Sequence, residues 1–390
     1  MAITTLLTTS VLALSVLTAD AVLPTRTSSL QGSPISGTWR IRLQDSWNWR
    51  RADGERWVSI QMRRKDDRGF GMSVPLSELE AAGIRGENWT GSNVSFRLTR
   101  DAGTIDFRGS FDSGRGTGEF TFAPNAEFVR AMQARDKTIS ADDVLKMAIH
   151  DVSRSFIQSV EAQGYQNLTT DDLVKMRIHG VDADYIAAFR KAGYDKLTVD
   201  ELIKTRIHGA TPAFVQELRA AGFDKLTIEQ LVKMRIHGVS PAFISEMRGL
   251  GFKELDLEDL VKMRIHGVSP TFVGEMRGLG FKELDTEDLV KMRIHGVSPT
   301  FVKEMRDLGY KELDVEDLVK MRIHNVSPQF IRELKELGYG DVREEQLVKF
   351  RIHGVTPEFI REVRSAGFKN MTPDDLVDFA IHGKRWLSKR

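Results

Sequence analysis

The sequence predicts an α+β multidomain protein: a small antiparallel β domain followed by an α-solenoid of about eight αα-hairpin repeats. Three observations lead to this fold class. The nine histidines recur every 29 residues, and a fixed period of 20–50 residues is typical of repeat arrays. The residues around each histidine carry the start and stop signals of two short helices. Before the first histidine, apolar residues alternate with period two, as they do in strands.

Residues 1–21 are predicted to be a secretory signal peptide. An apolar run at residues 3–19 is followed by a small-x-small cleavage site, Ala19-Asp20-Ala21. No Lys or Arg precedes the run, and an uncleaved anchor or a mispredicted start is the alternative. The run is short for a membrane span, and no stable span is expected after signal cleavage. Residues 22–36, rich in Ser, Thr, Pro and Gly, are expected to form a linker.

Residues 37–123 are predicted to form the antiparallel β domain, with about six strands arranged as a small sandwich or an open barrel. Alternating runs such as Val58, Ile60 and Met62 indicate strands, and glycine-containing turns separate them. Tryptophans gather near its start and form a candidate ligand-binding patch: Trp39, Trp47, Trp49 and Trp57. An enzymatic site here is the less favoured alternative, because the domain has no His or Cys and its carboxylates show no paired spacing.

Residues 124–139 are predicted to form a connecting helix, residues 140–383 the solenoid, and residues 384–390 a basic tail. In each repeat the first helix starts at a residue that can cap it, with Asp, Glu or Gln three positions later, as in a capping box. Arg343 is the one start residue that cannot accept the capping bond. The helix ends at His followed by Gly, Asn or Asp, which tolerate a left-handed conformation.

The second helix of each repeat starts at Ser, Thr or Asp, usually with Pro at its first position. An aromatic residue follows at the third position, and the helix stops at a Gly that precedes Tyr or Phe. These signals predict eight hairpins and a ninth first helix. Differences in the first copy, such as Ala148, Asp151 and Arg154, are interpreted as those of a terminal capping repeat.

The histidines form a ladder, and we interpret it as structural. A single histidine per repeat does not bring three or four ligands to one metal ion, so no metal site or cofactor is predicted. A histidine in the last helical turn favours the negative helix end or bonds to the next repeat. A pH-sensing ladder is the alternative. The ladder consists of His150, His179, His208, His237, His266, His295, His324, His353 and His382.

Two basic rows accompany the ladder. Each Lys of the first row follows Asp or Glu by four residues, as Lys262 follows Glu258, which predicts a pair within the helix. The second row is expected either to meet the acidic residues of the second helices, such as Glu246, or to be an interaction surface for an anionic peptide or polymer. This candidate interaction surface consists of Arg177, Arg206, Arg235, Arg264, Arg293, Arg322 and Arg351.

The unit M-R-I-H-G-V-[ST]-P-x-F-[IV]-x-E-[MLV]-R resembles a repeat of bacterial extracytoplasmic proteins. There it follows a BlaR1-type peptidase sensor domain or stands alone behind a signal peptide. The resemblance covers residues 140–383, and the peptidase motif and membrane helices of that family are absent from this sequence. It implies a protein of the bacterial envelope, linked to signalling, and it carries over no catalytic residue.

Composition narrows the function classes. The chain has no cysteine, which excludes disulfides, thiolate metal sites and cysteine nucleophiles. Net charge is +1 and acidic residues outnumber basic ones over residues 136–383, so no nucleic-acid partner is expected. We expect a non-enzymatic secreted or periplasmic module that binds an unidentified protein or peptide through its repeats. The alternative is a regulatory or sensory component of a BlaR1-type membrane peptidase signalling system.

Overall fold

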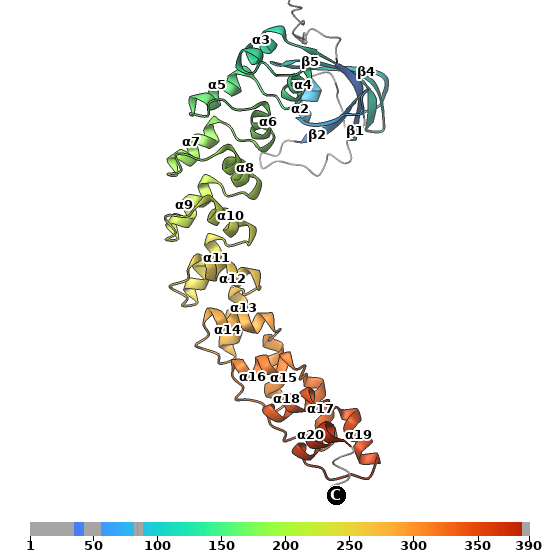
Figure 1. Cartoon of the computed structure of the whole chain (residues 1–390), viewed down its shortest axis with the longest axis vertical. Coiled ribbons are helices and arrows are strands. Elements are labelled where there is room, and N and C mark those ends of the chain that lie inside the picture. Colours follow the sequence, from blue (N-terminus) through green and yellow to red (C-terminus); the bar gives the residue numbers. More distant parts are fainter. Residues whose placement is uncertain (1–34, 43–55, 82–83, 85–88, 384–390) are drawn as a thin grey trace, which may run out of the picture. The chain divides into compact units, whose positions relative to one another are not determined.

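The structure, a computed structural model, describes residues 35–42, 56–81, 84 and 89–383. The predicted signal peptide, most of the predicted linker and the basic tail lie outside these residues. The chain divides into two compact units, Met1–Ile178 and His179–Arg390. The first unit holds a β-sheet, the first repeat and most of the first helix of the second repeat, and the second unit holds the repeats that follow (Figure 1). The predicted α+β class with a helical repeat region is confirmed.

Six strands form one antiparallel sheet in the order β3-β2-β1-β6-β5-β4. All the predicted alternating runs lie in strands, and β1 pairs with both β2 and β6 because β4, β5 and β6 fold back beside it. The strands are β1 (Ile35–Arg42), β2 (Trp57–Arg64), β3 (Gly69–Pro75), β4 (Gly91–Arg100), β5 (Gly103–Asp112) and β6 (Arg115–Pro124).

The sandwich alternative is wrong for the described residues, because every described strand belongs to one sheet. The sheet curves, and helices α2 (Leu76–Ala81) and α4 (Ala141–Ile149) lie at its open side (Figure 1). The strand faces directed to that side bury aromatic and aliphatic residues, including Trp39, Phe107 and Phe120. A second sheet is therefore unnecessary, since helices cover the apolar face.

Helix α2 lies between β3 and β4, and α3 (Ala126–Arg135) lies between the sheet and the repeats, within the residues expected to form a connecting helix. Eight hairpins and a ninth first helix follow, as predicted. After α4, the first helices are α6 (Thr170–His179), α8 (Val199–His208), α10 (Ile228–Ile236), α12 (Leu257–Ile265), α14 (Thr286–Ile294), α16 (Val315–Ile323), α18 (Glu344–Ile352) and α20 (Pro373–His382). The second helices are α5 (Arg154–Ala162), α7 (Ala183–Lys191), α9 (Pro212–Ala220), α11 (Pro241–Gly249), α13 (Pro270–Gly278), α15 (Pro299–Asp307), α17 (Pro328–Glu336) and α19 (Pro357–Ser365).

The predicted helix ends are confirmed by hydrogen bonds. The side chains of Thr198 and Thr227 each accept a hydrogen bond from the backbone N–H three residues later. The Glu or Gln side chain at that later position accepts in turn from the backbone N–H of the threonine. Such reciprocal capping satisfies two donors that the helix cannot pair itself. At the other end, Asn325 replaces the usual glycine and still adopts a left-handed φ of 57°. The local signals therefore fix where each helix begins and ends.

Arg343 lacks a side-chain capping bond, although its backbone has the extended cap conformation. We expect Arg343→Thr to raise the free energy of unfolding by about 1 kcal/mol, because a threonine hydroxyl can accept from the backbone N–H of Gln346. Thermal unfolding of the full chain, followed by circular dichroism, measures the change. Arg343→Ala is the control, since it removes the same charge without supplying an acceptor. Equal melting temperatures for the two variants would contradict the prediction.

Within the second unit, each first helix packs on the first helix of the next repeat, from α8 to α20. The second helices pack on each other in the same way from α11 to α19. Leu260, Val261 and Met263 of α12 are at most 2% exposed, and the equivalent residues of α14 and α16 are buried likewise. Equivalent positions therefore lie side by side along the stack, so any exposed side chain recurs in a row.

The first repeat is joined to the sheet. Helix α4 contacts β3, β5 and β6, and it buries Val144, Leu145, Met147, Ala148 and Ile149. Ala148 stands where most copies have Arg, and its small side chain is fully buried. The interpretation of Ala148 as part of a solvated terminal cap is therefore wrong, because its small side chain fits the helix to an apolar sheet.

Ion pairs complete this contact. Asp101, in the turn between β4 and β5, accepts from the backbone N–H of Arg154 at 2.7 Å and from its guanidinium Nε and Nη atoms. Asp142 of α4 pairs with Arg64 and Arg68 of the β2–β3 hairpin. Asp151 and Arg154 are charged residues that depart from the repeat consensus. Arg154 pairs with Asp101, and Asp151 pairs with Arg177. Among the described residues, no helix combines the length and apolar composition that crossing a membrane requires.

Candidate functional site

A row of exposed isoleucines marks the first-helix layer of the repeats. Each stands directly before the histidine of its copy and, except for Ile381, directly after the arginine. Each is 48–57% exposed, whereas other large apolar side chains in the described chain are covered better. Glu258, Lys262 and Ile265 are spaced i, i+4, i+7, so they share one helix face. The isoleucine row consists of Ile178, Ile207, Ile236, Ile265, Ile294, Ile323, Ile352 and Ile381.

This row was not among the sites predicted from the sequence. Its signal was the same β-branched apolar residue at one position of all nine copies. Helical periodicity does not separate it from the core, because Ile265 follows buried Val261 by four residues. Only the packing distinguishes them: the copy at Ile149 is 3% exposed because it faces the sheet, and the later copies have no such cover.

The arginines of the candidate interaction surface are placed beside the isoleucines, and each guanidinium lies over an aromatic ring of the preceding repeat. Arg264 lies 5.0 Å from the ring centroid of Phe243, and Arg206 lies 3.8 Å from that of Tyr185. The same contact recurs in the other copies. A cation over a ring face is attracted by the ring quadrupole, so each arginine ties two repeats together.

The same arginines reach the end of the preceding first helix. Arg235 Nε donates to the Gly209 carbonyl at 2.7 Å, and Arg322 Nε donates to the His295 carbonyl. Positive charge is favourable at this helix end. The residue that follows the histidine has a left-handed backbone, which glycine adopts most readily, as Gly238 does with a φ of 69°.

The arginines of the candidate interaction surface contact aromatic rings and backbone carbonyls. The expected contacts were with acidic residues of the second helices or with an anionic ligand in a groove. Only Arg177 has a carboxylate partner among the described residues, at Asp151. The remaining six carry positive charge without a described acidic partner, and Arg206, Arg235, Arg264, Arg293 and Arg322 are exposed. A parallel set on the second helices, exemplified by Arg277 over Phe252, was also missed.

The lysines form pairs between repeats. Lys233 contacts Glu258 of the next repeat at 2.7 Å, and Lys262 and Lys291 pair in the same way with Glu287 and Glu316. The expected pair within a helix, Glu258 with Lys262, is replaced by these contacts because stacked helices bring the next glutamate within reach. The lysine charges in this part of the array are therefore matched.

The histidines of the ladder lie at the ends of the first helices. Their backbone N–H groups donate to carbonyls of the last turn, as His266 does to Lys262. Within the described chain, His382 is the only one whose ring nitrogen has a hydrogen-bond partner, the Asp378 carbonyl. Burial lowers the pKa of His150. The described residues contain no cluster of histidine and carboxylate side chains that could share a metal ion.

The tryptophan patch is not assembled by the described residues. Trp39 is fully buried, and its indole Nε1 donates to the carbonyls of Arg108 and Glu119. Its neighbour on β6 is Gly118, which leaves room for the indole on that side, and its neighbour on β2 is Met62. Trp57 lies at the start of β2, half-buried, and Trp47 and Trp49 lie outside the described residues.

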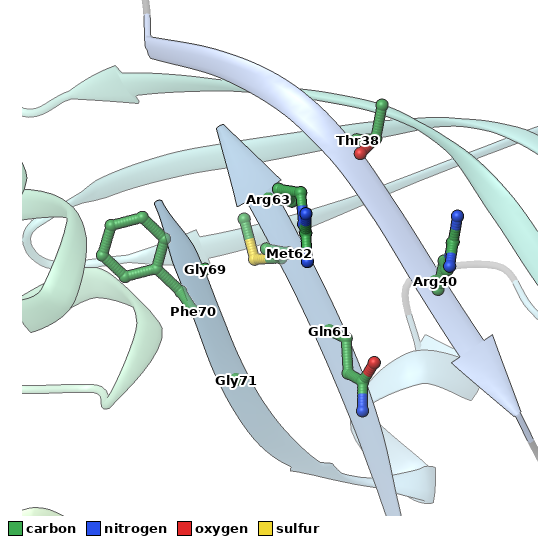
Figure 2. Close-up of a pocket in the computed structure, with 8 residues that line it drawn as sticks. All are labelled: Thr38, Arg40, Gln61, Met62, Arg63, Gly69, Phe70 and Gly71. Carbon is green, nitrogen blue, oxygen red and sulfur yellow. The ribbon is translucent and has the colours of Figure 1, made fainter. Parts of the chain in front are cut away.

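A hollow of about 500 Å³ lies on the outward face of β1, β2 and β3. Thr38 and Arg40 lie along β1, while Gln61 and Arg63 lie along β2 (Figure 2). Arg63 already pairs with Asp67 at 2.7 Å. Arg40 is therefore the one cation of the hollow without a described carboxylate partner. A single guanidinium is a weak basis for an anion-binding site.

The fold and the repeated rows define an α+β helical-repeat protein. Neither comparison with known proteins assigns it further: no family model matches the chain, and no curated protein is similar to it.

Proposed function

We propose that the chain is a protein-interaction module of the bacterial envelope, and that it binds its partner through the isoleucine row. The observation that carries this proposal is the repeated exposure of a large apolar side chain at one position of the stack. Exposed apolar surface costs free energy in water, and contiguous patches of it are typical of interaction sites. Because about half of each isoleucine is exposed, the row adds less to the core than a buried row would, and its recurrence is best explained by a partner.

The test is an affinity capture from bacterial envelope extract with the full chain as bait. The informative variant is Ile236→Ser/Ile265→Ser/Ile294→Ser, which removes three neighbouring members of the row. The matched control is Ala242→Ser/Thr271→Ser/Thr300→Ser, at exposed positions of the second helices in the same repeats. We expect a partner retained by the wild type and the control but lost from the isoleucine variant. Retention by all three baits would contradict the proposal.

A signalling role is the second candidate, and the observation that favours it is the repeat's resemblance to those that follow BlaR1-type peptidase sensor domains. In that case the captured partner is a membrane peptidase or one of its regulators. Mass spectrometry of the captured protein tests this: a partner unrelated to such a system would remove the second candidate and leave the first.

A further inference from the structure

The spacing of the isoleucine row restricts the shape of its partner. First helices of consecutive repeats are in contact from α8 to α20, and packed helices lie about 8–10 Å apart. Equivalent isoleucines such as Ile236, Ile265 and Ile294 are therefore expected at about this spacing. The row is one side chain wide in each repeat.

Among regular chain conformations, polyproline II fits this spacing best. Its three residues per turn rise about 9.3 Å, so every third side chain returns to the same side. In a β-strand, side chains on one face recur at about 6.6–6.8 Å, which is too short for the row. A partner helix would match only every seventh residue, at about 10.5 Å, and it would bury a stripe broader than one residue per repeat.

The charges beside the row restrict the partner's chemistry. Six isoleucines of the row follow an arginine that lies over a ring of the preceding repeat and has no described carboxylate partner. These arginines are Arg206, Arg235, Arg264, Arg293, Arg322 and Arg351. The nearby lysines of the central repeats are matched by glutamates. The uncompensated charge along the row is therefore positive, and carboxylates on the partner would complement it.

We propose that the isoleucine row binds an extended, acidic peptide in the polyproline II conformation, with an apolar side chain at every third position. This inference rests on the proposed function and names the class of its partner. The apolar side chains would contact the isoleucines, and the acidic side chains would lie near the arginines. A preformed polyproline II chain also loses little conformational entropy on binding.

Binding of a labelled peptide to the full chain tests the proposal by fluorescence anisotropy. The probe contains six Pro-Glu-Leu triplets. Its first control has the same composition with leucines alternately two and four residues apart, and its second has Gln in place of Glu. We expect the regular acidic peptide to bind at least about tenfold more tightly than either control, because spacing and charge each contribute.

The same protein variants complete the design. Ile236→Ser/Ile265→Ser/Ile294→Ser should weaken peptide binding by about tenfold or more, while Ala242→Ser/Thr271→Ser/Thr300→Ser should leave it unchanged. Circular dichroism melts of both variants verify that they fold. Equal binding of the regular and irregular peptides, or of the two variants, would overturn the proposal.

Two further outcomes separate this inference from the function on which it rests. Isoleucine-dependent capture of an envelope protein without binding of the Pro-Glu-Leu peptide overturns the peptide class and leaves the interaction module. Isoleucine-dependent binding to vesicles of anionic phospholipid, without peptide binding, overturns the proposal in favour of a membrane surface. Loss of all isoleucine-dependent binding overturns both.

Discussion

Replacing Ile149 with alanine should lower the free energy of unfolding of the first unit by about 2–4 kcal/mol, because a buried side chain is removed from the contact between α4 and the sheet. The same replacement at Ile265 should cost less than about 1 kcal/mol, since 53% of that side chain is already in water. The two residues occupy equivalent positions of the repeat, so the comparison isolates the effect of the surroundings.

Urea unfolding of the full chain measures both variants. Five of the six tryptophans belong to the first unit, where Trp39 and Trp89 are buried, so tryptophan fluorescence reports mainly on that unit. Circular dichroism reports on the helices of both units. Similar decreases in the free energy of unfolding for Ile149→Ala and Ile265→Ala would contradict the placement of α4 against the sheet. They would also remove the distinction between a structural and an exposed isoleucine on which the proposed function depends.

Replacing Asp101 with asparagine should destabilise the first unit by about 1.5–3 kcal/mol at neutral pH, the range for hydrogen bonds to charged groups. The Asp101 carboxylate holds both the backbone N–H and the guanidinium of Arg154. Asparagine preserves the shape but removes the charge. Asp112→Asn, at the exposed end of β5, is the control and should have little effect.

The loss of stability caused by Asp101→Asn should depend on pH in a defined direction. The hydrogen bond from the Arg154 side chain is the main cause that lowers the pKa of Asp101 below its ordinary value. A carboxyl whose pKa is lower in the folded state stabilises that state above the unfolded pKa of about 4, and its contribution is lost as pH falls through the folded pKa. The difference in melting temperature between wild type and Asp101→Asn should therefore narrow below about pH 4. A constant difference from pH 7 to pH 3 would contradict this assignment.

Much of the repeat architecture could be read directly from the chain because its signals are local. A capping hydroxyl, a proline and a left-handed glycine each act within a few residues, so Thr198, Pro212 and Gly209 mark helix ends without reference to the rest of the fold. The strand runs were equally readable, since alternation is a local pattern. Their assembly into one sheet was not, because pairing β1 with β6 depends on residues about 80 positions apart.

The residues of the candidate site show the same division. The sequence by itself determined the rows: a 29-residue period places one lysine, arginine, isoleucine and histidine at fixed positions, and stacking aligns them. Only the tertiary structure decided what each row does, because every partner comes from a neighbouring repeat or from the sheet. Arg264 covers Phe243, Lys262 meets Glu287, and Ile265 remains in water while Ile149 is covered. Burial and charge pairing depend on what lies opposite a side chain, and no local pattern specifies that.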